Sequence, residues 1–424
     1  MSFSLLDFFT HPILRGPTWG TLFLCLSSSL MGVILLLQRR PLLSEALSHT
    51  MWPGILLALF FPIPIALGGI LFALLGYFSI SFLEKKKVPS DTALAFSLAS
   101  FFGLGVTLAS ALQIQKPKAY QEVQHLLLGQ AAILDDKALV VPALLTLAIV
   151  LLLLFRFRSI QLLLFDPAFA RCSGLARKPL ELALLALLLL SLLSGIRSVG
   201  VLLLSGIAIA PAIAARQFTN RLQTLFLLAA LFGALSGLFG IWLSVWGTTV
   251  LSCSGSLPTG PTVIAVGGTI ALLSLLFAPK RGWLFRFFRI AFFRLKCIEE
   301  NVLKTLWKQG TLSFSTLKKT HCIPFLRYIL WRLQSAGWVE KEAKGLVYRL
   351  SPDGVQKAAS IVRLHRLWEL YLTSSLGLGK EKVHGSAEEM EHILTPELEK
   401  ELTHHLSHPE VDPHDQQIPS PRRL

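Results

Sequence analysis

The chain has 424 residues, of which 53% are hydrophobic and 15% are charged, and its formal net charge is +15. This apolar composition exceeds that of an ordinary soluble domain and indicates a large membrane-embedded part. The charges are unevenly distributed, because nine of the 25 acidic residues precede Arg281 and sixteen follow it. The composition therefore excludes a single soluble domain, and the change near Arg281 predicts a boundary between a membrane part and a polar part.

Eight apolar runs precede that boundary, and a helix needs about 20 residues to cross the hydrocarbon of a membrane. Two prolines, Pro62 and Pro64, divide the longest run. We therefore predict an all-α membrane domain of eight or nine transmembrane helices. Nine is favoured, with one helix from near Leu43 to Phe61 and another from Ile65 to Phe82. The runs are 20–37, 51–83, 91–113, 138–155, 179–196, 198–214, 222–247 and 261–278.

Lys and Arg gather in the loops at alternate ends of these runs. Positive charge is retained on the cytoplasmic side during insertion, so nine spans place the amino terminus outside and the carboxyl-terminal part in the cytoplasm. We therefore expect a multi-pass membrane protein.

Two ionisable residues, Glu45 and His49, lie in the helix predicted to begin near Leu43. They are four residues apart and share one face of a helix, where they offer oxygen and nitrogen ligands to a divalent cation. A charge in hydrocarbon is costly and is usually kept for a pathway or a partner. The alternative is that the two side chains bond each other near Arg39 and Arg40.

The segment Arg39–Gly54 resembles the hallmark of ABC-type permeases for zinc, manganese and iron, although this family often has Asp where the chain has Glu45. Phe165–Gly174 is similar to the family's cytoplasmic loop that docks on the ATPase, and 200–216 and 257–262 match further signatures. The resemblance implies that Glu45 and His49 line the transport pathway. It also implies an ATPase-docking set of Phe165, Asp166, Phe169 and Gly174.

The docking segment has the pattern of a short amphipathic helix that fits a groove on a soluble partner, or else of an interfacial loop. The sequence contains no Gly-x-x-x-x-Gly-Lys-Ser/Thr loop for nucleotide phosphates. We therefore expect a permease subunit that is not itself an enzyme. The resemblance implies a separate ABC ATPase subunit, an extracytoplasmic metal-binding protein and a second permease subunit, identical or different.

Beyond Arg294 the pattern changes to amphipathic helices. We predict a helix over 298–308, a second over 312–320, a turn at 321–323 and a third helix over 324–336. Alternating residues at 337–341 and 346–350 predict two strands. This order is typical of a soluble winged-helix domain over 298–350.

In a winged helix, the second helix of the helix-turn-helix enters the major groove of DNA, and basic residues around it contact phosphates. The alternative is a winged helix that contacts proteins, with its lysines in solvent. The candidate DNA-binding residues are Pro324, Arg327, Tyr328, Arg332 and Lys344, with Lys318 and Lys319 beside phosphates.

The segments 361–372 and 383–392 resemble the diphtheria-toxin-repressor family of iron- and manganese-dependent regulators, and the resemblance covers roughly 298–419. It implies a metal-binding and dimerisation domain, a homodimer and operator DNA. One metal site would contain His365, Glu369 and His384, and the other Glu388, Glu391 and His392. The family's second site also draws ligands from the first winged-domain helix, where Asn301 and Lys304 stand in this chain.

Mixed carboxylate and imidazole ligands suit Fe(II) or Mn(II) as co-repressor. The alternative is a set of salt-bridging side chains on a dimerisation helix. The combination of both families in one chain is similar to the permease–repressor fusion found in chlamydiae.

The expected layout is a transmembrane permease domain at 1–280, a basic aromatic juxtamembrane linker at 281–297 that contacts lipid, the winged helix at 298–350 and the metal-binding domain at 351–424. We expect import of Fe, Mn or Zn and metal-dependent repression of uptake genes, with release of the tail by proteolysis near 282–297. One alternative is a tail that inhibits transport directly without binding DNA. Another is a transporter with a degenerate tail.

Overall fold

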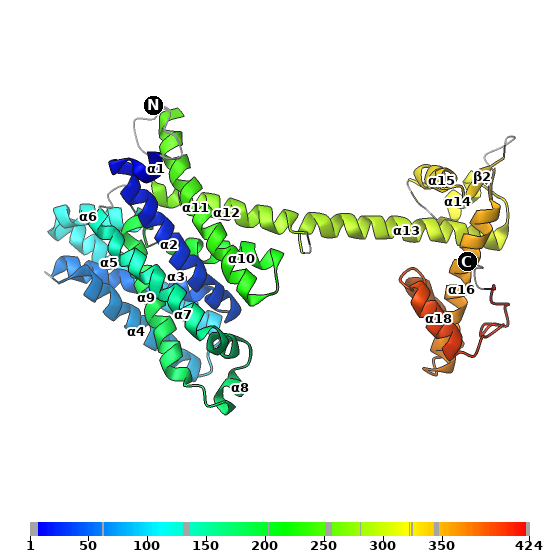
Figure 1. The fold of residues 1–424 in the computed structure, drawn as a ribbon, viewed down its shortest axis with the longest axis horizontal. Coiled ribbons are helices and arrows are strands. Elements are labelled where there is room, and N and C mark those ends of the chain that lie inside the picture. Colours follow the sequence, from blue (N-terminus) through cyan, green and yellow to red (C-terminus); the bar gives the residue numbers. More distant parts are fainter. Residues whose placement is uncertain are drawn as a thin grey trace. The chain divides into compact units, whose positions relative to one another are not determined.

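The computed structural model describes residues 7–61, 63–129, 136–201, 203–250, 257–279, 281–321, 323, 325–342 and 347–420. It divides the chain into two compact units, Met1–Phe285 and Arg286–Leu424 (Figure 1). Each unit is described by itself below.

Unit 1 is built from helices. They are α1 (Asp7–Thr10), α2 (Pro12–Leu37), α3 (Leu42–Phe60), α4 (Ile65–Lys85), α5 (Ser90–Gln115), α6 (Pro117–Leu128), a 3-10 turn η2 (Asp136–Leu139), α7 (Val140–Phe165), α8 (Pro167–Cys172), α9 (Arg177–Val199), α10 (Leu204–Phe218), α11 (Leu222–Val250) and α12 (Thr259–Phe277).

Seven of the described helices are long and apolar enough to cross a membrane, namely α2, α4, α5, α7, α9, α11 and α12. The two other segments counted as spans form α3, which contains Glu45 and His49, and the shorter α10. The all-α membrane domain is confirmed. The predicted division of 51–83 is also correct, because α3 ends at Phe60 and α4 begins at Ile65.

Helix α3 lies in the interior of unit 1, where Leu47, Met51, Trp52 and Ile55 are buried. Outer helices expose large apolar side chains such as Phe155, as expected for surfaces solvated by lipid. Small residues allow close approach: a Cβ at Gly32 of α2 would lie 1.8 Å from the carbonyl oxygen of Ala208 in α10. Small residues at such positions allow two helices to pack tightly.

Helix α13 (Trp283–Gln309) is one continuous helix of 27 residues. The predicted helix over 298–308 is its last part, and most of the expected linker at 281–297 is helical too. The reason is local, because no Gly or Pro interrupts the chain between Trp283 and Gln309. Six aromatic side chains in its first part are exposed: Trp283, Phe285, Phe287, Phe288, Phe292 and Phe293.

The winged-helix region of unit 2 follows α13 as β1 (Leu312–Ser313), α14 (Phe314–His321), α15 (Leu326–Ser335), β2 (Val339–Lys341) and β3 (Val347–Leu350). The strands form an antiparallel sheet in the order β1-β3-β2, with Val339 opposite Leu350 and Leu312 opposite Tyr348. The predicted winged helix is confirmed. Its second helix was expected to start at Leu312, but Leu312 and Ser313 instead pair with β3.

The last helices are α16 (Pro352–Ser374), α17 (Lys380–Met390) and α18 (Pro396–His405). Ser351 caps α16 by accepting a hydrogen bond from the backbone N–H of Gly354, and Pro352 occupies the first turn. Ala358 and Ile361 of α16 belong to the same hydrophobic core as Val302, Leu317 and Ile329 of the winged-helix region. This core therefore joins the first half of α16 to the winged-helix region.

The chain after α18 returns to α16 through two arginines. Arg363 donates to the carbonyl oxygen of Pro419 at 2.7 Å and to Glu399 of α18 at 2.9 Å, and Arg366 donates to Gln416. These contacts hold α16 in place, and α16 supplies two of the candidate metal ligands.

Candidate metal centre and associated sites

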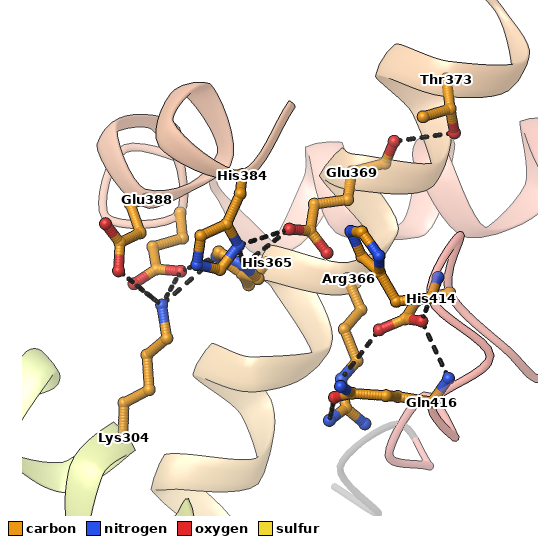
Figure 2. Close-up of polar contacts among 11 residues, drawn as sticks. Lys304, His365, Arg366, Glu369, Thr373, His384, Glu388, His414 and Gln416 are labelled. Carbon is orange, nitrogen blue, oxygen red and sulfur yellow. Dashed lines mark hydrogen bonds and ion pairs between the residues drawn. The ribbon is translucent and has the colours of Figure 1, made fainter. Parts of the chain in front are cut away.

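Three candidate ligands meet where α16 and α17 approach each other. His365 and Glu369 lie one turn apart on α16, and His384 comes from α17. His365 Nε2 is 3.1 Å from Glu369 Oε1 and 3.2 Å from His384 Nδ1, and His384 Nδ1 is 2.7 Å from Glu369 Oε1 (Figure 2). One ligand atom of each residue lies within 4.8 Å of the other two. The three residues therefore fit a divalent metal ion, and we call them the His384 cluster.

The surroundings of Glu369 favour the negatively charged form of its carboxylate, which is the form that binds a cation. Burial raises the pKa of Glu369, but hydrogen bonds with His365 and His384 outweigh it and lower that pKa to about 2. Burial lowers the pKa of His365, but its hydrogen bonds with Glu369 and Glu391 outweigh burial and raise it. Both shifts favour the charged forms of Glu369 and His365 in the absence of metal.

A further carboxylate orients His365. Its Nδ1 lies 2.5 Å from Glu391 Oε2, which leaves Nε2 directed at Glu369 and His384. A ligating histidine commonly bonds a carboxylate through its other ring nitrogen, which fixes the tautomer and the ring orientation. Glu391 was expected in the second metal site, but in the structure it supports the first.

The expected second set is arranged differently from a metal site. Helix α17 ends at Met390, so Glu391 caps the helix and His392 follows it. Glu391 keeps helical backbone angles at this cap and faces Lys304 together with Glu388, so the expected shared face holds for these two residues, whereas His392 lies beyond the helix. Lys304 Nζ is 3.0 and 2.9 Å from the two carboxylate oxygens of Glu391 and 3.8 Å from Glu388 Oε1. Both oxygens of the buried Glu391 carboxylate thus already contact the Lys304 ammonium.

His392 has a partner that the sequence analysis missed. Its Nδ1 lies 2.7 Å from Oε2 of Glu300 on α13. Asn301 was expected near this site, but its described contact is made by its backbone carbonyl, which accepts from the Thr305 hydroxyl. The signal available in the sequence was the spacing of Glu300 and Lys304, which places both residues on one face of α13.

The candidate DNA-binding residues divide into two groups. Arg327 and Tyr328 are exposed on α15, where Arg327 lies over the Phe314 ring and Tyr328 stacks on Trp331. Arg332 instead forms an ion pair with Glu299 of α13, with 3.0 Å between Nε and Oε1. Pro324 and Lys344 lie outside the described residues. Trp331, which the sequence analysis did not select, is 61% exposed on the same surface.

The candidate transport pair lies on α3. His49 is buried with its ring 4.9 Å from that of Phe102, and Glu45 is half-buried one turn earlier. Among the described residues, no hydrogen-bond partner is present for His49 Nδ1. This nitrogen therefore does not bond Glu45, as the alternative interpretation of the pair would have allowed.

The candidate docking segment forms the short helix α8. Asp166 caps it, accepting from the backbone N–H of Phe169 at 2.8 Å, and the Phe165 and Phe169 side chains are 60% and 56% exposed. Gly174 ends the turn at φ +70°, a conformation that favours glycine. The four predicted residues thus present two aromatic side chains on a capped turn.

Comparisons with known proteins identify both parts of the chain. Residues 10–278 match the model of the ABC 3 transport family. The chain belongs to this family. In this ABC 3 member, residues 351–420 match the iron dependent repressor, metal binding and dimerisation domain. The permease is 37% identical to a probable metal transport system membrane protein of Chlamydia trachomatis over 94% of both chains. The expected combination of a permease domain with a repressor domain is confirmed.

Two further comparisons support the permease part. The protein is 30% identical to the manganese transport system membrane protein MntC of Bacillus subtilis, over 87% of this chain and 86% of that one. The structure of PsaBC from Streptococcus pneumoniae in complex with Fab covers 66% of this chain and 97% of its own, with a TM-score of 0.57 and 23% identity. Because the identity is 23%, this comparison shows only that the two chains share a fold.

Proposed function

We propose that the protein is the permease subunit of an ABC importer for a divalent metal and that its tail is a metal-dependent transcriptional repressor. The main support for this proposal is the His384 cluster. It lies in a repressor-type metal-binding domain on the same chain as an ABC 3 permease. A metal-uptake protein that also carries a metal sensor can adjust uptake to supply.

Import requires subunits beyond this chain. A separate ABC ATPase would dock on α8, an extracytoplasmic protein would deliver the metal, and a second permease subunit, identical or different, would complete the pathway past Glu45 and His49. The protein would lie in the bacterial inner membrane with its tail in the cytoplasm. Similar proteins are named for manganese and zinc transport, and oxygen and nitrogen ligands accept Fe, Mn or Zn.

The tail would use Fe(II) or Mn(II) as its co-repressor. Two imidazoles and one carboxylate, without a thiolate, are the donor set of the His384 cluster, and this set suits these ions. Imported metal would bind the cluster, favour the DNA-competent homodimer by differential affinity, and reduce transcription of the uptake genes. Arg327 and Tyr328 of α15 would contact the operator DNA.

Release of the tail would widen its access to DNA. The segment 282–297 is mostly helical, and its exposed aromatic residues alternate with Arg286, Arg289 and Arg294, a composition suited to a lipid surface. Cleavage here would require local unfolding of α13. Immunoblots of metal-replete and metal-starved cells test this step, and full-length protein alone under both conditions would contradict it.

The decisive experiment measures binding of residues 286–424 to the promoter of the transport operon at fixed salt, with and without Fe(II), Mn(II) or Zn(II). We expect metal-enhanced, sequence-specific binding that Arg327→Ala weakens at the operator and His384→Ala makes insensitive to metal. Lys400→Ala, a change on the exposed surface of α18, is the matched control. Absence of specific binding with all three metals would overturn the repressor function.

A second candidate function is direct inhibition of transport by the metal-loaded tail, without DNA. It is favoured by the presence of the permease domain and the metal-binding domain on one chain. Metal uptake into proteoliposomes containing the complete importer separates the two functions. Inhibition by internal metal that disappears in His384→Ala would support the direct mechanism, and equal uptake by both proteins would exclude it.

A further inference from the structure

We propose that the ammonium group of Lys304 is a built-in cation that stands in for a second metal ion, so that the tail takes one regulatory metal ion per chain. This inference rests on the proposed function of the tail as a metal sensor. It assigns the residues Lys304, Glu391 and Glu388 to a permanent ionic contact, which we call the lysine clamp.

The position of Lys304 carries the inference. The residue lies on α13, is 5% exposed and directs its side chain at the end of α17 (Figure 2). Its Nζ bonds both carboxylate oxygens of Glu391, whose side chain is fully buried, and lies 3.3 Å from His365 Nδ1. The ammonium thus donates to both oxygens of one buried carboxylate, and the Nδ1–H of His365 donates to the same carboxylate.

A divalent ion in the same place would conflict with this arrangement. It would need the oxygens of Glu391, and it would then lie a few ångströms from the Lys304 ammonium in a buried region where like charges repel strongly. Glu388 is drawn to the same ammonium, and His392 is held by Glu300. Each member of the expected second ligand set therefore already has a partner that a second metal ion would have to displace.

Hydrogen bonds also connect the lysine clamp to the His384 cluster. Glu391 Oε2 bonds both Lys304 Nζ and His365 Nδ1, and the opposite ring nitrogen of His365 faces Glu369 and His384. A chain of contacts thus runs from α13 through a carboxylate and an imidazole to the His384 cluster. The fixed cation holds α13 against the end of α17 before metal arrives, so that the single ion acts on an assembled support.

The test is the metal content of the full-length protein in detergent, equilibrated with Mn(II), desalted and measured by mass spectrometry of the elements. Metal bound to the membrane part is the same in every variant, so it cancels when the metal content of a variant is compared with that of wild type. His384→Ala is expected to lose about one ion per chain relative to wild type. Glu388→Gln and His392→Gln are expected to lose none. Lys304→Glu is expected to gain about one ion, and adding His392→Gln to it is expected to abolish the gain.

The outcomes separate this inference from the proposed function. Loss of one ion in Glu388→Gln or His392→Gln would show a second metal site beside Lys304 and overturn the lysine clamp. Loss of no ion in His384→Ala would instead contradict the proposed metal sensor. Glu388 has a side chain that is 57% exposed, so Glu388→Gln is expected to fold. The metal content of Glu388→Gln therefore tests the lysine clamp even if Lys304→Glu or His392→Gln does not fold.

Discussion

Glu300 and His392 join the winged-helix region to the metal-binding region: Glu300 Oε2 on α13 lies 2.7 Å from His392 Nδ1, just past α17. Both side chains are buried. Lys304 lies one turn further along α13 and contacts Glu391, the neighbour of His392. Two adjacent residues of one region are thus tied to one helical face of the other, and a shift of α17 would act directly on the helix that supports the winged-helix core.

The contact between Glu300 and His392 is expected to contribute to stability. Replacing Glu300 with Ala leaves a buried imidazole without its acceptor, which typically costs about 1–3 kcal/mol. Urea unfolding of residues 286–424 measures the loss. Glu340→Ala is the matched control, because its partner Arg349 is exposed and such pairs contribute roughly 0–1 kcal/mol. Equal losses in both variants would show that the buried contact has no special weight.

Removal of the central carboxylate is expected to abolish high-affinity metal binding. Glu369 contacts both imidazoles of the His384 cluster, so Glu369→Ala removes the anionic ligand and the group that positions the other two. Calorimetric titration of residues 286–424 with Mn(II) should show a loss of affinity of at least about 100-fold, beyond the 10- to 100-fold typical of outer partners. His404→Ala, on the exposed side of α18, should bind as wild type does.

Stability of the metal-free tail is expected to be greatest between about pH 4.5 and 6.5. The pKa of Glu369 falls from 4.5 to about 2, because its hydrogen bonds outweigh burial, so its contribution is present above pH 4.5 and is lost as the pH falls towards 2. The pKa of His365 is raised above 6.5, so its contribution is complete below pH 6.5 and is lost as the pH rises through the raised value. Urea midpoints across this range test the profile, and Glu369→Gln should flatten its acidic side.

The exposed aromatic surface of α8 is expected to bind the ATPase subunit. Phe169→Ala removes a ring that is 56% exposed on a helix capped by Asp166, so co-purification of the ATPase with the permease should fall at least about tenfold. Phe155→Ala is the control, because this ring is exposed on α7 among the membrane-spanning residues. Normal co-purification of Phe169→Ala would place the ATPase elsewhere.

Much of this protein was determined by local sequence. Continuous apolar runs predicted the membrane helices, the prolines at 62 and 64 predicted the division between α3 and α4, and alternating residues predicted β2 and β3. Such features depend on periodicity and on a few residues with restricted backbone conformations, which the sequence displays directly. Spacing four residues apart on α16 likewise placed His365 and Glu369 on one face.

Tertiary structure decided which of the candidate ligands act together. The pairing of Glu300 with His392, and of Lys304 with Glu391, joins residues 92 and 87 positions apart, and no local period reports such contacts. The same applies to Arg332, which looked available for DNA but forms an ion pair with Glu299 of α13. The sequence supplies the charged groups, but their partners are chosen by the packing of α13 against α15 and the end of α17, because a buried charge must find its counter-charge across the core.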